Sequence, residues 1–118
     1  MPKFVIQEHN ASHLHYDFRL EIDGALKSWA VPKNLPEKSR VKRLAIQVDD
    51  HPADYINFEG IIPEGSYGAG TVRIYDDGEY KLNFRSEKKI EFYLYGKIFS
   101  GLYKIYNIGN DQWLIEKV

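Results

Sequence analysis

The sequence predicts an all-β fold, and more specifically a small closed β-barrel. Apolar residues recur with period two in many short runs, and no window of a dozen residues shows sustained helical spacing. Turn-forming pairs separate the runs, namely Asp23-Gly24, Asp77-Gly78, Tyr95-Gly96, Ser100-Gly101 and Gly109-Asn110. Many short strands in 118 residues favour closure into a barrel, because exposed sheet edges promote aggregation.

Ten runs are predicted as strands from this alternation. Three precede the first long loop, at 4–8, 14–22 and 27–31. Seven follow it, at 44–48, 54–58, 71–75, 80–84, 90–95, 102–106 and 113–116. Nine Tyr, six Phe and two Trp suit a barrel core and its rims, since aromatic residues favour strands and fill volume.

Two segments do not fit the strand pattern. Residues 32–43 contain two prolines and a basic cluster, and are predicted as a loop; the cluster is Lys38, Arg40, Lys42 and Arg43. Such a cluster can follow a nucleic-acid backbone or hold a terminal phosphate, although charged loops are commonly only solvated. Residues 65–71 are rich in glycine but precede a strand and lack the Lys-Ser/Thr pair of a P-loop, so they are predicted as a structural turn.

Composition excludes several classes of protein. Cysteine is absent, so any metal must be held by His, Asp, Glu or carbonyl oxygens. No apolar run approaches 18 residues and no signal peptide is evident at Met1, which leads us to expect a cytoplasmic protein with no membrane partner. The length suits a single domain over residues 1–118.

The charge balance bears on nucleic-acid binding. Sixteen Lys and Arg stand against seventeen Asp and Glu, which gives a net charge of −1. This near-neutral balance argues against a broad electrostatic surface for a polyanion. A nucleic-acid partner therefore has to be held by a local patch.

The histidine-rich stretch 9–22 carries the strongest chemical signal. From 14 to 22 polar and apolar residues alternate strictly, which places His15, Asp17 and Arg19 on one strand face. Same-face neighbours are about 6.6–6.8 Å apart, so His15 and Asp17 can converge on one cation, and His9 can return as a third ligand. Two nitrogens and one carboxylate oxygen suit Mn²⁺ or Zn²⁺. The alternative is the solvated face of a half-buried strand.

Further candidates lie near this set. Arg19 can present its planar fork to a phosphate beside the metal, or it can form a cross-strand ion pair. His51 follows a predicted strand and can bind phosphate or act as a general acid, or it is a surface residue in a turn. Tyr55 and Lys33 carry weaker signals when taken singly.

Six motifs follow one another along the chain: VIQEH at 5–9, LHYDFRLE at 14–21, LKSWAVPK at 26–33, DHPADY at 50–55, FEG at 58–60 and IPEGSYGAGTV at 62–72. Together they resemble the 3′-phosphoesterase domain of bacterial DNA ligase D, here as a free-standing domain. The resemblance implies a barrel of about eight antiparallel strands with a crescent-shaped active-site groove. It also implies a monomer that works on the 3′ end of a DNA or RNA primer-template, with a separate ligase or polymerase as a partner.

The same resemblance implies the activity and the residues that carry it. The family uses a divalent metal, with Mn²⁺ preferred and Zn²⁺ or Co²⁺ as alternatives, to remove a 3′-terminal ribonucleoside and to hydrolyse a 3′-phosphate to a 3′-hydroxyl in DNA repair. By motif, the metal ligands are His9, His15 and Asp17. The phosphate-site residues are Arg19, His51 and Tyr55, and the supporting basic residues are Lys33 and Arg43.

Two other functions remain open. One is a non-catalytic barrel that binds nucleic-acid ends through a structural metal and recruits a ligase or polymerase. The other is a small-molecule barrel enzyme with two His and one carboxylate on its metal, which leaves the basic loop unexplained. The open coordination positions and Arg19 favour catalysis over end binding, because a structural site is usually closed by four protein ligands. Metal-dependent turnover separates the two functions.

Overall fold

The computed structural model describes residues 1–118 as one antiparallel sheet of nine strands. The strands are β1 (Lys3–Asn10), β2 (Leu14–Ile22), β3 (Ala25–Val31), β4 (Lys42–Pro52), β5 (Gly60–Ile62), β6 (Gly70–Arg85), β7 (Lys89–Gly96), β8 (Ser100–Gly109) and β9 (Gln112–Lys117). One short 3₁₀ helix, η1 (Ala53–Asn57), joins β4 to β5. No helix is long and apolar enough to cross a membrane.

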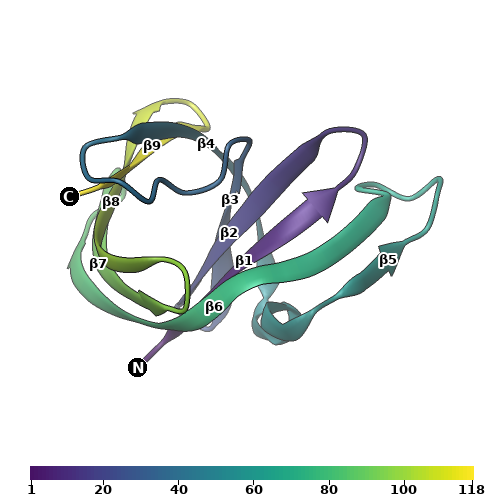
Figure 1. The fold of residues 1–118 in the computed structure, drawn as a ribbon, viewed down its shortest axis with the longest axis horizontal. Coiled ribbons are helices and arrows are strands. Elements are labelled where there is room, and N and C mark those ends of the chain that lie inside the picture. The colour runs from purple at the N-terminus through teal and green to yellow at the C-terminus, as the bar shows by residue number, and fades with distance from the viewer.

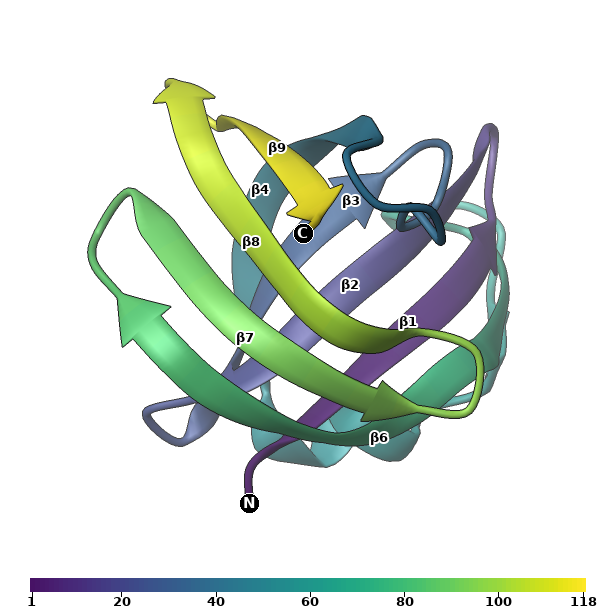
Figure 2. The same ribbon diagram turned by 60° about the vertical axis from the view of Figure 1, so that its left-hand side comes forward.

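Eight of the strands close into a barrel. Their order is β1-β2-β3-β4-β9-β8-β7-β6, and pairing of β1 with β6 completes the circle. In Figure 2, β6, β7 and β8 cross in front, and β1 to β4 form the wall behind them. Strand β5 lies outside the closed circle and pairs only with the start of β6, at the right of Figure 1. The predicted all-β barrel is confirmed.

The barrel interior is packed with the aromatic side chains that the composition suggested. Phe18 and Trp29 are fully buried and stack with their ring centroids 6.0 Å apart, and Trp113 meets Trp29 edge-on at 5.6 Å. On β2 the predicted apolar face points inward at Phe18 and Leu20, whereas Leu14 is 50% exposed at the end of the strand. The opposite face of β2 therefore lies on the outside of the barrel.

The predicted strand at 54–58 is wrong, because this segment contains η1. Pro52 lacks a backbone N–H and ends the pairing of β4. The chain then turns tightly, and the Phe58 N–H donates to the Tyr55 carbonyl at 3.0 Å. As a result Tyr55 and Phe58 lie on the same side of the segment, with parallel rings 4.7 Å apart.

The predicted turn at Asp77-Gly78 is also wrong, because β6 runs through it as one long strand. This strand pairs with β1 over its first part and with β7 over its second part. Gly78 is needed there because a Cβ atom would collide with the Tyr95 carbonyl of β7. The Asp76 carboxylate is buried beside it and accepts hydrogen bonds from four backbone N–H groups, those of Asp77, Lys97, Ile98 and Phe99.

The loop predicted at 32–43 is confirmed in outline, with β4 starting at Lys42, slightly earlier than expected. At its other end β4 extends to Pro52, so that His51 belongs to a strand and not to the loop beyond it. This length brings His51 along the same side of the barrel as the outward face of β2.

Candidate active site

A cleft of about 630 Å³ lies on the outer face of the barrel. Its floor is formed by outward side chains of β1 and β2, including His9, His15, Asp17 and Arg19. Asp17 and Arg19 are only 7% and 3% exposed. The alternative of a solvated strand face is therefore wrong, because these two side chains are buried. Buried charges of this kind need partners or a ligand.

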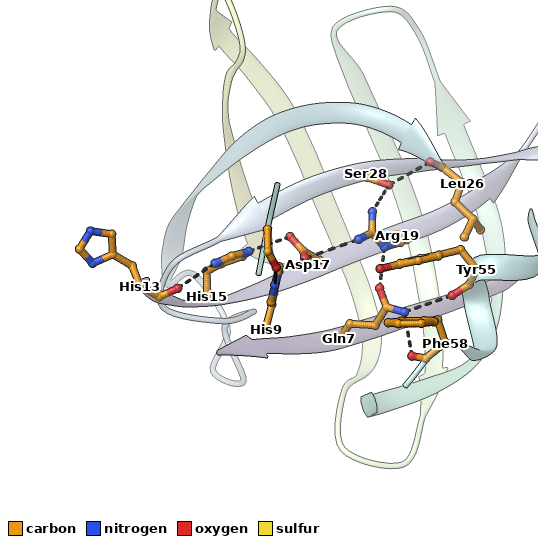
Figure 3. Close-up of polar contacts among 11 residues, drawn as sticks. Gln7, His9, His13, His15, Asp17, Arg19, Leu26, Ser28, Tyr55 and Phe58 are labelled. Carbon is orange, nitrogen blue, oxygen red and sulfur yellow. Dashed lines mark hydrogen bonds and ion pairs between the residues drawn. The ribbon is translucent and has the colours of Figure 1, made fainter. Parts of the chain in front are cut away.

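His9, His15 and Asp17 form one cluster (Figure 3), and their ligand atoms all lie within 4.8 Å of one another. The register of the β1–β2 pair places His9 directly opposite His15. His9 Nδ1 lies 3.4 Å from Asp17 Oδ2, and His15 Nε2 lies 3.3 Å from Asp17 Oδ1. Donor atoms held about 2.1 Å from one ion are separated by roughly 3.0–3.4 Å, so these separations suit a shared cation.

Backbone carbonyls fix the proton positions on both imidazoles. His9 Nε2 donates to the Gly68 carbonyl at 2.7 Å, and His15 Nδ1 donates to the His13 carbonyl at 3.1 Å. A carbonyl only accepts, so in each imidazole the other ring nitrogen, His9 Nδ1 or His15 Nε2, faces Asp17. That nitrogen shares a proton with the carboxylate when the ring is charged, and it offers a lone pair to a cation when the ring is neutral. Metal-binding histidines are held in this manner.

The ionisation of the cluster agrees with this geometry. Burial raises the pKa of the Asp17 carboxyl, but the hydrogen bond with His15 and the charge of Arg19 outweigh it, so the pKa lies below its usual value. The hydrogen bond with Asp17 raises the pKa of His15 in spite of its burial. The cluster therefore keeps a carboxylate anion and attracts positive charge to the space between the rings.

Arg19 is held beside Asp17 by neutral partners. Its Nε donates to Gln7 Oε1 at 2.7 Å, and its Nη1 donates to Ser28 Oγ at 2.8 Å. Its Nη2 lies 3.5 Å from Asp17 Oδ2, in an ion pair longer than a good hydrogen bond. A guanidinium has five N–H donors, so Arg19 keeps donors for a ligand in the cleft.

Sequence reasoning missed Gln7 and Ser28, the two residues that orient Arg19. Gln7 is fully buried, and its amide nitrogen donates to the carbonyls of Tyr55 and Phe58 at 3.1 and 3.2 Å. It ties η1 to the floor of the cleft and fixes Arg19 at the same time. Its position in the sequence could have identified Gln7. It directly follows the apolar residues Phe4-Val5-Ile6 and lies two positions before His9, so both side chains are on the same face of the strand.

A column of three rings forms the wall beside Arg19. His51 stacks on Tyr55 with ring centroids 4.4 Å apart, and Tyr55 stacks on Phe58 at 4.7 Å. The Arg19 guanidinium lies 5.0 Å from the centre of the Tyr55 ring. Burial and the charge of Arg19 lower the pKa of His51, so this imidazole is mostly neutral near pH 7. Both His51 and Tyr55 line the cleft that contains the histidine cluster.

The remaining candidates lie elsewhere. Lys33 and Arg43 line a second hollow of about 470 Å³, where Arg43 Nη1 donates to the Lys33 carbonyl at 2.8 Å. They share that hollow with Tyr16, and neither lines the cleft of the histidine cluster. The His13 side chain points away from the cluster in Figure 3, and only its carbonyl takes part.

Comparison with known proteins places this site in a family. A family model described as the DNA ligase D 3′-phosphoesterase domain matches residues 7–107. The chain belongs to this family. The matched segment of this DNA ligase D domain contains every residue discussed above for the cleft and for the second hollow.

Multifunctional non-homologous end joining proteins named LigD are similar over 66% to 98% of the chain. The Mycobacterium tuberculosis protein is 49% identical over 119 residues, covering 98% of this chain and 16% of the relative. The Mycolicibacterium smegmatis protein is 45% identical over 127 residues, covering 98% and 17%. The Pseudomonas aeruginosa protein is 60% identical over 78 residues, covering 66% and 9%. The chain thus spans less than a fifth of the length of these curated relatives.

Proposed function

We propose that this chain is a metal-dependent phosphoesterase that heals 3′ ends of DNA or RNA in DNA repair. It hydrolyses a 3′-terminal phosphate to a 3′-hydroxyl, and it removes a 3′-terminal ribonucleoside. Membership of the DNA ligase D 3′-phosphoesterase family supports the reaction class. The single observation that carries the proposal is the pair of histidine ring nitrogens, His9 Nδ1 and His15 Nε2, that converge on Asp17 beside the buried Arg19.

His9, His15 and Asp17 are the residues that would hold the metal, which we propose to be Mn²⁺, with Zn²⁺ or Co²⁺ as substitutes. A divalent cation bound there supplies a Lewis acid that polarises a phosphoryl oxygen. Three protein ligands would leave coordination positions on such a metal for water or substrate, as a catalytic site requires.

The charges on the floor of the cleft match those of a terminal phosphate. The Asp17 carboxylate and the Arg19 guanidinium cancel, and the two imidazoles are neutral when they bind a metal. A divalent cation then leaves two positive charges on the floor of the cleft. A phosphate monoester dianion carries two negative charges, so the site favours a terminal phosphate over the singly charged diester within a strand.

Arg19, His51 and Tyr55 act on the phosphoryl group. Arg19 donates to the non-bridging oxygens and stabilises the charge that accumulates on them during transfer. We assign His51 a hydrogen bond to a phosphoryl oxygen, because its ring stacks on Tyr55 in the lining of the cleft that contains Arg19. Tyr55 lies between them and donates its hydroxyl to the same group.

We assign Lys33 and Arg43 to holding the nucleic-acid strand outside the cleft. Their separate hollow supports strand binding and does not support a part in the chemical step. The exposed Lys38 lines the same hollow and adds to its positive charge. Phosphate contacts of this type position a strand without reading its sequence.

The biological setting follows from the proposed reaction. We propose that residues 1–118 act as one domain, as a monomer in the cytoplasm, on the 3′ end of a primer-template. The restored 3′-hydroxyl is the group that a separate ligase or polymerase needs. The names of the end-joining relatives support a role in double-strand break repair.

Phosphate release from a 3′-phosphorylated primer-template tests this function. The purified chain is incubated with Mn²⁺, Zn²⁺, Co²⁺ or Mg²⁺, and both inorganic phosphate and extendable 3′-hydroxyl are measured. A second primer ending in a ribonucleotide tests removal of the terminal ribonucleoside. We expect both products with Mn²⁺. Tight metal-dependent binding of the primer without release under any metal would instead identify a non-catalytic end-binding barrel.

A further inference from the structure

Tyr67 is the most exposed large apolar side chain of the molecule. Its relative exposure is 102%, whereas Tyr80 and Tyr103 are buried in the barrel. Tyr67 nevertheless lines the cleft that contains His9, Asp17 and Arg19. A fully exposed ring buries no apolar surface on folding, so the stability of the barrel does not explain an aromatic residue at this position.

The loop that carries Tyr67 is ordered by its own hydrogen bonds. In the segment 63–69, Ser66 N–H donates to the Pro63 carbonyl and Ala69 N–H donates to the Ser66 carbonyl, both at 3.2 Å. Gly68, the residue that follows Tyr67, accepts the 2.7 Å hydrogen bond from His9 at its carbonyl. The backbone of Tyr67, in the loop between β5 and β6, is therefore fixed one residue away from the contact that orients His9.

Charges on the two rims of the cleft direct a polyanionic strand toward this loop. The β4 rim presents Asp49 and Asp50, both exposed. The opposite rim of the cleft lies on the β1 side of β2. Apart from the histidine cluster, its lining carries no charge and consists of Ala11, Ser12, Ile62, Tyr67 and Gly68. A strand whose terminal phosphate lies beside Arg19 avoids like charge by leaving over the uncharged rim.

We propose that Tyr67 is a stacking platform for a nucleobase at the 3′ end of the strand whose phosphate occupies the cleft. This inference rests on the proposed function and adds the part of the substrate that is bound beyond the phosphate. Exposed aromatic rings bind successive bases in single strands in this way, and every base offers a suitable π-face. Stacking selects a nucleotide end over a bare phosphate monoester but discriminates little among bases.

Two matched substrates test the proposal. Both are primer-templates with a 3′-phosphate, and one has an abasic deoxyribose as its last nucleotide. For Tyr67→Ala we expect KM on the normal end to rise about 5- to 150-fold, the range of single base–aromatic stacking, with kcat little changed. On the abasic end Tyr67→Ala should have the same KM as the wild type. Tyr67→Trp should keep the wild-type KM on both ends. Tyr95→Ala, which removes an exposed tyrosine of β7 that does not line the cleft, serves as the control.

A spectroscopic measurement identifies the base and does not depend on turnover. 2-Aminopurine fluorescence falls on stacking, so the base analogue is placed at the 3′-terminal or at the fourth position of a primer with a 3′-phosphate. We expect quenching by the metal-loaded wild type at the terminal position only, and none by Tyr67→Ala. Equal KM values for Tyr67→Ala and the wild type on the normal end would overturn the proposal, as would equal losses on both ends. If the wild type releases no phosphate, the proposed function fails. The quenching of 2-aminopurine and the affinity for the primer, each compared between the wild type and Tyr67→Ala, then test the role of Tyr67 separately.

Discussion

His9 donates its Nε2 proton to the Gly68 carbonyl at 2.7 Å, and this one contact decides which ring nitrogen faces Asp17. Gly68 belongs to the glycine-rich segment that sequence reasoning interpreted as a structural turn only. The turn is real, but its carbonyl also orients a metal-ligand candidate. The loop and the cluster are therefore one unit, although Gly68 and His9 are 59 positions apart.

Gly68→Ala should weaken metal binding in addition to the fold, whereas Gly65→Ala should weaken the fold alone. Gly68 has φ +76°, and an added Cβ would lie 3.3 Å from His9 Cε1. Gly65 has φ +86° with nothing within 4 Å, so Gly65→Ala carries the same backbone strain without the contact. We expect both variants to lose about 1–2 kcal/mol of stability, and only Gly68→Ala to lose about tenfold or more in Mn²⁺ affinity. Thermal unfolding and Mn²⁺ titration measure the two effects; equal affinities in the two variants would contradict this role of Gly68.

Gln7→Leu should lower kcat/KM by about 100-fold, because a misplaced Arg19 no longer meets the phosphoryl oxygens. Ser28→Ala removes only one of the two neutral partners of Arg19 and should have a smaller effect. Gln7→Glu separates the two roles of this side chain, since a carboxylate still accepts from Arg19 but cannot donate to the Tyr55 and Phe58 carbonyls. Steady-state kinetics should rank the variants in the order Ser28→Ala, Gln7→Glu, Gln7→Leu, from least to most impaired; unchanged kinetics in Gln7→Leu would refute the positioning role.

Asp76→Ala should destabilise the barrel by about 3 kcal/mol or more, since it leaves four backbone N–H groups without their acceptor at the β7–β8 turn. The neighbouring Asp77 offers a matched control. It makes an exposed ion pair with Lys97 at 3.1 Å, and Asp77→Ala should lose less than about 1 kcal/mol. Urea unfolding measures both values, and similar losses for the two variants would show that the buried carboxylate is not the main support of this turn.

Much of the candidate site could be predicted from the sequence because it is local. His9, His15 and Asp17 lie within nine positions on two paired strands, and strict alternation on β2 determines which side chains share a face. The burial of Asp17 and Arg19 could not be predicted this way. It depends on η1 and on the loop around Gly68, both of which come from distant parts of the chain.

The wrong predictions of secondary structure also concern segments whose conformation the local sequence pattern does not determine. Asp77-Gly78 has the composition of a hairpin turn, but Gly78 is required by the close approach of the Tyr95 carbonyl on a neighbouring strand. Three of the four backbone N–H groups that donate to Asp76 lie more than 20 positions away. The short apolar segment at 54–58 fits a strand or a tight helical turn equally well by periodicity, and the proline before it decided the outcome.

Alkaline pH should unfold the protein through its buried tyrosines. Burial raises the pKa of Tyr80 to about 12, and its hydroxyl donates to the Glu21 carbonyl at 2.6 Å; burial also raises the pKa of Tyr103. An unfolded tyrosine has a pKa of about 10, so the stabilisation is complete below pH 10 and is lost as the pH rises through 12. The melting temperature should fall steeply over this window in the wild type and less steeply in Tyr80→Phe. A parallel fall in the two proteins would count against Tyr80 as a cause.

The most direct test of the account compares His15→Ala with His13→Ala in Mn²⁺-dependent phosphate release from a 3′-phosphorylated primer-template. The two histidines are neighbours in the same hairpin, but only His15 directs a ring nitrogen at Asp17, and His13 contributes a backbone carbonyl that the substitution retains. The account predicts a loss of about 100-fold or more for His15→Ala, together with lost Mn²⁺ affinity, and near wild-type activity for His13→Ala. Wild-type phosphate release and Mn²⁺ affinity in His15→Ala would contradict it.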